Sequence, residues 1–222
     1  MLFVYFKAPF GAFKPFQSIE LHATADFITP SAAYGLLLGL AGIDCHVDYE
    51  RKREFLDARI AIGQKHRPLP GRLLQQLHKM PAGSVSQETL DRAKGNKPKI
   101  DIFRRDHLCR LEGYIGVRHE KLEALVRKGI EEPATLNYWG LPFMGDNNFF
   151  LERLDAKDRP DRCRWFYPFK EHNLREGERL YYFSVWTDYE PNPTSYSRLF
   201  ALSEMKDSLE KDDEAWISIG PG

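Results

Sequence analysis

Cysteine is scarce in this sequence. Its 222 residues include three cysteines, Cys45, Cys109 and Cys163, which form no CxxC pair and no Cys/His pair at zinc-site spacing. An odd, sparse set of this kind is typical of free thiols in a reducing compartment. We therefore expect no disulfide framework, no metal site and no cofactor.

Long apolar runs are missing as well. No stretch of about 18 apolar residues is present, so we expect no membrane span. The opening MLFVYFKAPF is interrupted by Lys7 and Pro9 too early for a secretory signal. These absences predict a cytoplasmic protein without a membrane partner.

The common enzyme signatures are also absent. The sequence has no Walker A motif, no GxGxxG, no GxSxG and no HExxH. Asp146, Asn147 and Asn148 resemble a fragment of a calcium loop, but no bidentate acid follows at the required distance, which favours a plain turn.

One residue set leaves catalysis open. Tyr114 lies in an expected strand, and His119 and Lys121 lie just beyond it. Such a set can cleave RNA without a metal, because a base activates the 2′-hydroxyl and a lysine stabilises the phosphorane charge. The simpler interpretation is a solvent-facing helix start with ordinary polar residues.

Net charge is absent from the chain as a whole but not from one segment. The basic segment, residues 65–110, holds eleven cations against four anions, an excess of seven in a chain that balances 32 against 32. Its weak apolar periodicity predicts an extended arm, such as a β-hairpin, that leaves the main body. The cations are Lys65, Arg67, Arg72, Lys79, Arg92, Lys94, Lys97, Lys99, Arg104, Arg105 and Arg110.

A basic arm on a neutral body favours nucleic acid as a partner. Lysine and arginine neutralise phosphates and release counterions, and neighbouring apolar side chains can stack on bases. Two alternatives remain: a solvated loop, and a module whose charges bind an acidic protein. The expected helix start at Thr29–Ser31 adds a second candidate phosphate site, with an ordinary capped core helix as its alternative.

The order of expected elements indicates the fold. Strands are expected at 2–7, 55–64 and 111–117, with helices at 32–43 and 119–128 and a further strand before residue 155. The order β–α–β, arm, β–α–β predicts an α+β, ferredoxin-like (RRM-like) body. Gly35, Gly39 and Gly42 recur along the first helix, which predicts a close approach of another backbone.

The C-terminal part has a different character. A charged linker is expected at 155–164, followed by short aromatic strands at 164–169, 179–186, 198–202 and 215–219. We therefore divide the chain into an RRM-like domain, 1–154, and a β-rich extension, 155–222, that packs on it. The aromatics of the extension are expected to serve partly as core and partly as interface.

One motif also resembles a known family. The segment FITPSAAYGLLLGLAGI, residues 27–43, resembles the signature of CRISPR-associated protein family five, and its wording is most similar to the Myxan-like subtype of type I systems. The loop APFGAFKPF precedes it, as in that family. The basic segment lies where the family inserts a thumb, and YWGLPFMGDNNFF, residues 138–150, is similar to a later glycine-bearing segment.

The resemblance implies a role and partners. Members of the family have a ferredoxin-like fold with a β-hairpin thumb, and they cap the 5′ handle of the CRISPR RNA (crRNA) in a Cascade complex. Their partners are family-seven backbone and family-eight large subunits, with target DNA near the PAM-proximal end as a further candidate. One subtype cuts precursor RNA itself with a Tyr, Lys and His set. That pattern is not clear here, so we expect no catalysis.

Twelve residues are expected to contact RNA on this basis. They are Lys14, Ser31, Tyr34, Lys65, Arg67, Arg72, Lys97, Lys99, Arg104, Arg105, His107 and Arg110.

Overall fold

The computed structural model describes residues 1–14, 23–44, 49–79, 99–135, 141–170, 179–187 and 195–220. Within these residues the chain forms one nine-stranded sheet, the helices α1, α2 and α4, and a 3-10 turn. In chain order the elements are β1 (Leu2–Gly11), α1 (Pro30–Leu40), α2 (Tyr49–Arg53), β2 (Arg59–Gln64), β3 (Leu69–Lys79), β4 (Lys99–Arg118), α4 (Glu120–Glu131), η1 (Pro133–Thr135), β5 (Arg153–Lys157), β6 (Cys163–Pro168), β7 (Tyr181–Thr187), β8 (Ser195–Lys206) and β9 (Ile217–Ser218).

The body has the predicted α+β, ferredoxin-like arrangement. Its four strands lie in the order β5-β1-β4-β2, and neighbours in this order pair antiparallel. Helix α1 connects β1 to β2, and α4 connects β4 to β5, so both βαβ units are present. Apolar side chains of α1 and α4 pack on one face of this sheet in the larger core.

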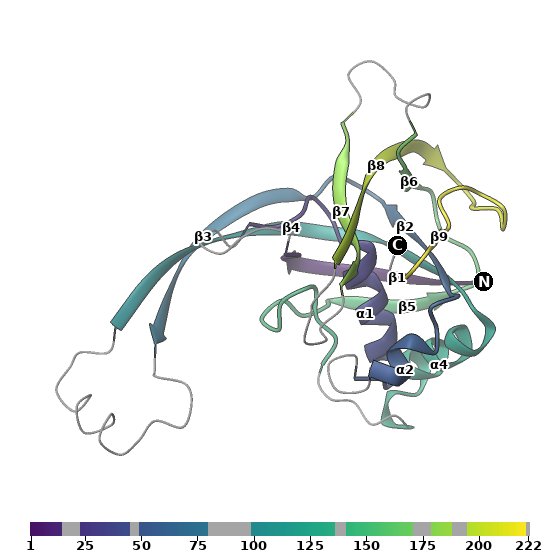
Figure 1. The fold of residues 1–222 in the computed structure, drawn as a ribbon, viewed down its shortest axis with the longest axis horizontal. Coiled ribbons are helices and arrows are strands. Elements are labelled where there is room, and N and C mark those ends of the chain that lie inside the picture. The colour runs from purple at the N-terminus through teal and green to yellow at the C-terminus, as the bar shows by residue number, and fades with distance from the viewer. Residues whose placement is uncertain are drawn as a thin grey trace.

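A hairpin extends from this body (Figure 1). Strand β3 pairs with β4 along its whole length, from Leu69 opposite Cys109 to Lys79 opposite Lys99. Strand β4 is 20 residues long, so its first half belongs to the hairpin and its second half to the body. The basic segment therefore contains an antiparallel pair, and its strands begin at Leu69, beyond Lys65 and Arg67.

The two halves of β4 meet at Arg110. Its backbone has a φ of 59°, the left-handed region that non-glycine residues rarely adopt. Leu108 and Leu111 are three positions apart, yet both lie in the larger core, which a regular strand of period two does not allow. The register with β1 stays constant across this point, so the backbone conformation of Arg110, and not an inserted residue, shifts the side-chain alternation where the hairpin leaves the body.

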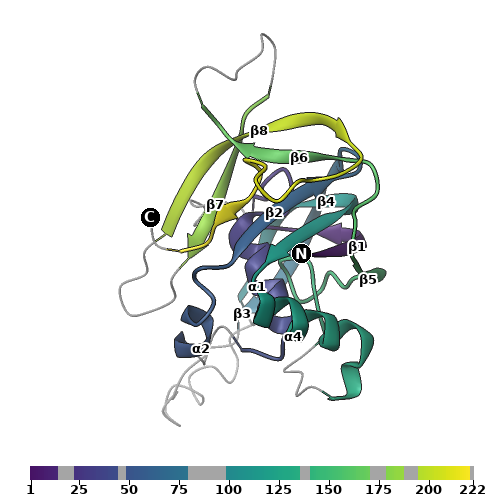
Figure 2. The same cartoon turned by 90° about the vertical axis from the view of Figure 1, so that its right-hand side faces the viewer.

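The second face of the body sheet is also covered. Phe3 and Tyr114 are buried there, and Phe3 contacts Trp165 and Trp216 of the C-terminal part at ring-centroid distances of 5.9 and 6.0 Å. Figures 1 and 2 place β6 and β9 beside β2, with α4 on the opposite side of the molecule. Seven large aromatics in the described residues of this part are buried: Trp165, Phe166, Tyr181, Phe183, Trp186, Phe200 and Trp216.

The outer edge of β2 is shared by two C-terminal strands. Arg59 and Ile60 pair with β9, whereas Gly63 and Gln64 pair with β6. The proposed division after residue 154 falls inside β5, and the charged stretch that follows supplies the second half of that strand rather than a linker alone. Strand β2 begins at Arg59, because a short helix and a turn occupy 49–57.

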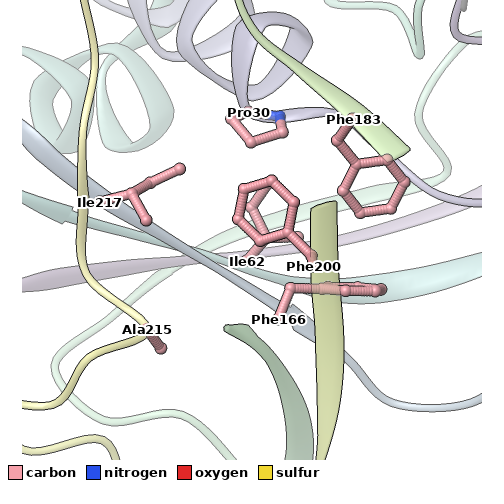
Figure 3. A pocket seen from close by; sticks show the side chains of 7 residues that line it. All are labelled: Pro30, Ile62, Phe166, Phe183, Phe200, Ala215 and Ile217. Carbon is pink, nitrogen blue, oxygen red and sulfur yellow. The ribbon is translucent and has the colours of Figure 1, made fainter. Parts of the chain in front are cut away.

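Core packing continues between α1 and the C-terminal strands. Figure 3 shows Phe166, Phe183 and Phe200 around Ile62, with Pro30 of α1 above them. These side chains leave no space for a water-sized molecule. The aromatics that the sequence concentrates in its C-terminal part therefore fill this region as core.

Helix α1 begins with the predicted N-cap, but its glycines do not have the predicted role in packing. The Thr29 hydroxyl accepts a hydrogen bond from the Ala32 amide at 3.3 Å, and Pro30 follows at the first helical position. Gly42, with a φ of 75°, ends the helix in a Schellman arrangement. A methyl group added at Gly35 or Gly39 would meet nothing within 4 Å, so the expected close backbone approach at these two glycines is wrong.

Close approach instead requires glycine in the central strands. A Cβ at Gly113 would lie 2.2 Å from the Gly63 carbonyl oxygen, and one at Gly63 would lie 2.9 Å from the Cys163 sulfur. Gly113 allows β4 to lie close to β2, and Gly63 allows β2 to lie close to β6, so neither position has room for a side chain.

We predict opposite effects for two glycine-to-alanine substitutions. Gly113→Ala should lower the free energy of unfolding by about 2 kcal/mol or more, because its methyl group meets backbone. Gly39→Ala should raise it by up to about 1 kcal/mol, because it adds helix propensity in open space. Urea unfolding of both variants measures the difference, and equal effects would contradict this packing.

Candidate nucleic-acid interface

Three cations on the hairpin and its base are exposed. The side chains of Arg67, Arg104 and Arg110 make no hydrogen bond or ion pair within the described part of the chain. Arg67 lies just before β3, Arg104 in the hairpin half of β4, and Arg110 at the left-handed position where the two halves of β4 meet. These three, the hairpin cations, are free to bind an anion. Lys14, also exposed, follows β1.

Arg72 is exposed but already paired. Its guanidinium donates to both oxygens of Asp106, its partner across the hairpin, at 2.6 and 3.3 Å. This hydrogen bond lowers the pKa of the Asp106 carboxyl. The pair fixes the orientation of Arg72 on the hairpin surface, where the remaining N–H groups face solvent.

Arg105 serves the packing of the hairpin base. Its side chain is 16% exposed and forms an ion pair with Asp146, itself 14% exposed. It also lies 5.7 Å from the centre of the Phe149 ring. Asp146 accepts from the Asn148 amide at 2.9 Å, which is the plain turn expected from the sequence. Arg105 therefore anchors the 141–150 loop to the hairpin base.

His107 is buried at the same base. Its ring lies between Phe10 and Phe149, at centroid distances of 5.5 and 6.1 Å. It also covers Gly71, where an added Cβ would lie 2.4 Å from the ring nitrogen Nε2. Like Arg105, His107 holds the hairpin to the body.

The expected phosphate site at the start of α1 is closed. Tyr34 is buried at 2% exposure with its ring 6.1 Å from Trp186, and Ser31 donates to the Thr187 hydroxyl at 3.3 Å. Thr29 caps the helix, so the ordinary capped core helix is the better description.

Two of the expected RNA contacts cannot be placed. Lys97 lies outside the described residues, and Lys99 begins β4 with its side chain outside them.

Sequence reasoning missed a polar cluster beside the covered face of the sheet. The Tyr114 hydroxyl donates to Asp161 at 2.5 Å, and Lys157 donates to the same carboxylate at 2.9 Å. Lys65 lies 3.7 Å from both Glu112 and Asp161, so this candidate RNA contact is also paired. Asp161 falls in the stretch interpreted as a linker, so no local pattern indicated that it meets Tyr114.

The cluster has shifted proton affinities. Hydrogen bonds from Tyr114 and then Lys157 lower the pKa of Asp161 to about 2. Burial, and then the hydrogen bond to Asp161, raises the pKa of Tyr114. Because a tyrosine with a raised pKa yields its proton less readily, this environment does not prepare Tyr114 as a general base.

The candidate catalytic set does not converge. Tyr114 faces the core that contains Trp165 and Trp216. His119 is the N-cap of α4, where its Nδ1 accepts from the Leu122 amide at 3.1 Å. Lys121 forms an ion pair with Glu54, which follows α2. His119 and Lys121 both contact the Phe55 ring, at 5.2 and 5.8 Å from its centre, whereas Tyr114 lies in the separate core cluster with Trp165.

Comparison with solved structures supports the fold. A chain described as "CRISPR RNA-guided surveillance complex" has a TM-score of 0.57 and 8% identity, with 94% of this chain and 90% of that chain covered. A second, described as "Crystal structure of Cas protein", has a TM-score of 0.52 and 12% identity, with 93% and 95% covered. No protein-family model and no curated protein matches the sequence. The chain therefore shares its fold with CRISPR-associated proteins.

Among the described residues, no group of three or more His, Cys, Asp or Glu side chains is placed to hold a metal ion. No described helix is long and apolar enough to cross a membrane.

We predict a pH-dependent contribution from Asp161. Its pKa is lowered from 3.8 to about 2 on folding, so its stabilisation is present above the unfolded value and is lost as the pH falls through about 2. Asp161→Asn should therefore lower the melting temperature at neutral pH, and the difference from the parent should disappear towards pH 2. Thermal unfolding across this range measures it. Asp212→Asn controls for the loss of one surface charge, and a difference that persists at low pH would contradict the assignment.

Proposed function

We propose that this chain is a non-catalytic crRNA-binding subunit of a type I CRISPR Cascade complex that caps the 5′ handle of the crRNA. The observation that carries the proposal is the long hairpin with its exposed cations, on a ferredoxin-like body. Similarity to a chain described as a CRISPR RNA-guided surveillance complex supports this context. The resemblance of residues 27–43 to family five, Myxan-like subtype, points to the same role.

One face of the body sheet is covered, and for this reason we assign RNA binding to the hairpin. RRM domains bind single-stranded RNA through aromatics on the open face of the sheet. Here Phe3, Tyr5 and Tyr114 occupy that face and are buried beneath the C-terminal part. Exposed guanidinium groups on the hairpin are left to bind phosphates.

The RNA contacts are assigned on exposure. The hairpin cations Arg67, Arg104 and Arg110 contact phosphates, with the exposed Lys14 and Arg72 as additional contacts. Lys97 and Lys99, whose side chains lie outside the described residues, are proposed as contacts from the sequence alone. Arg105, His107, Tyr34 and Ser31 are assigned to the packing of the body instead.

Exposed apolar side chains around the hairpin support protein partners. Leu69 and Leu74 of β3 are 53% and 69% exposed, and Phe10, near the hairpin base, is 44% exposed. Grouped exposed apolar residues are typical of interaction surfaces. We propose that they contact family-seven backbone and family-eight large subunits in the cytoplasm, with target DNA near the PAM-proximal end as a further partner.

We predict that reversing the hairpin cations weakens RNA binding in a salt-dependent way. The triple variant Arg67→Glu, Arg104→Glu, Arg110→Glu should lose at least about tenfold in affinity for crRNA repeat RNA at low salt. Its plot of log affinity against log salt should become shallower by about 2, since each lost phosphate contact removes about 0.7. Fluorescence anisotropy across a salt series measures both quantities.

A second triple variant provides the matched control. Lys128→Glu, Arg159→Glu, Arg162→Glu reverses three exposed cations outside the hairpin. It changes the net charge equally, so it should leave most of the affinity and the slope intact. Equal losses in both variants would mean that overall charge, and not the hairpin, governs binding.

We predict no RNA cleavage. Labelled repeat-containing precursor RNA, incubated with the protein and a chelator, should remain intact on a denaturing gel. A single discrete cut that is lost in His119→Ala would overturn the non-catalytic assignment and identify a metal-independent endoribonuclease.

A further inference from the structure

An open cavity lies where β4 ends and β2 begins, at the end of the sheet away from the hairpin. It has a volume of about 320 Å³ and is lined by Met1, Asp57, Arg59, Arg118, Glu123 and Lys211. Arg118 ends β4, whereas the hairpin lies at the start of that strand (Figure 1). From Arg110 to Arg118 the strand rises about 26 Å, so the cavity is separate from the hairpin cations.

Two arginines face each other across the strands at this cavity. Arg59 of β2 and Arg118 of β4 are directly opposite in the antiparallel register, so their side chains emerge on the same face of the sheet. Like charges directly opposite each other destabilise a strand pair. A sequence that keeps two guanidinium groups here gains from an anion that lies between them.

Arg118 is held in place, whereas Arg59 is free. The Arg118 guanidinium lies 5.5 Å from the Trp216 ring centre and donates to the Lys211 carbonyl oxygen. The exposed side chains of Arg59 and Lys211 make no hydrogen bond or ion pair with any described residue. One oriented and two available cations therefore border the same cavity.

The two carboxylates of the cavity already have other partners. Glu123 pairs with the Met1 ammonium at 2.8 Å and accepts from the His119 amide at 3.1 Å. Asp57 lies 3.3 Å from the Nε2 atom of His119. Neither carboxylate is recorded in contact with Arg59 or Arg118, so the charge of the two arginines is not neutralised from within the cavity.

We propose that this cavity is a second anion site and that it binds phosphate groups through Arg59, Arg118 and Lys211. A single guanidinium can saturate the two oxygens of a carboxylate, whereas a phosphate has enough oxygens to accept from cations on several sides. The volume lies at the lower end of the range for small-molecule sites, which leaves room for a linked pair of phosphates.

Isothermal titration calorimetry of the full chain with pyrophosphate at low salt tests the site. We expect one saturable site per chain, weakened about tenfold by Arg59→Gln and several-fold by Lys211→Gln, because each removes a charge-assisted contact. Arg159→Gln, at an exposed arginine outside both the hairpin and the cavity, is the matched control and should bind pyrophosphate like the parent.

Thermal unfolding separates ligand binding from folding. Arg59 is exposed, and its removal relieves a like-charge pair, so Arg59→Gln should melt at or above the parental temperature without ligand. Pyrophosphate should raise the melting temperature of the parent, as a ligand of the native state does, and should raise that of Arg59→Gln much less.

Competition identifies the source of the phosphate. A short RNA that displaces pyrophosphate from the parent indicates an RNA strand, and failure to displace it indicates a small phosphate-bearing molecule; both outcomes support the site. Absence of saturable binding, equal binding by Arg59→Gln and the parent, or displacement by a polyglutamate peptide without pyrophosphate binding would overturn it. Repeat-RNA affinity measured with Arg59→Gln keeps this result separate from the hairpin proposal.

Discussion

The hydrogen bonding of β4 on both of its edges is the constraint on which the molecule depends. Its body half pairs with β1 and β2, and its hairpin half pairs with β3. The left-handed residue Arg110 allows one continuous strand to serve both parts, because its backbone conformation shifts the side-chain alternation between them. A hairpin that shares a strand with the core is held in a defined direction and not on a linker.

Both faces of the body sheet and its edge at β2 are covered by other elements, and this limits which surfaces can bind ligands. Trp165 and Trp216 cover one face, α1 and α4 the other, and β6 and β9 occupy the outer edge of β2. An uncovered edge would invite pairing with another chain, and an uncovered aromatic face would bind bases. With both occupied, the exposed charge of the hairpin and of the cavity at the opposite end of β4 carries the proposed binding.

The cations of the basic segment fall into two groups in the structure: some form ion pairs with carboxylates, and others are exposed. Arg105 and Lys65 are held by carboxylates from Asp146 and Asp161, residues far along the chain, whereas Arg67, Arg104 and Arg110 are exposed. The charge of the sequence identifies the basic segment. It does not identify which of its cations are paired, because an ion pair between distant residues has no local pattern. The cross-strand pair of Arg59 and Arg118 has no local pattern in the sequence either, because the two residues lie on different strands.

The sequence by itself determined the α+β fold class, the order of the strands and helices, and the N-cap of α1, because periodicity, turn residues and capping are local properties of the chain. Only the tertiary structure decided that Gly113 and not Gly39 is sterically required, that Tyr34 and His107 are buried, and which arginines are free. These properties depend on contacts between residues far apart in the sequence, and such contacts exist only once the sheet has assembled.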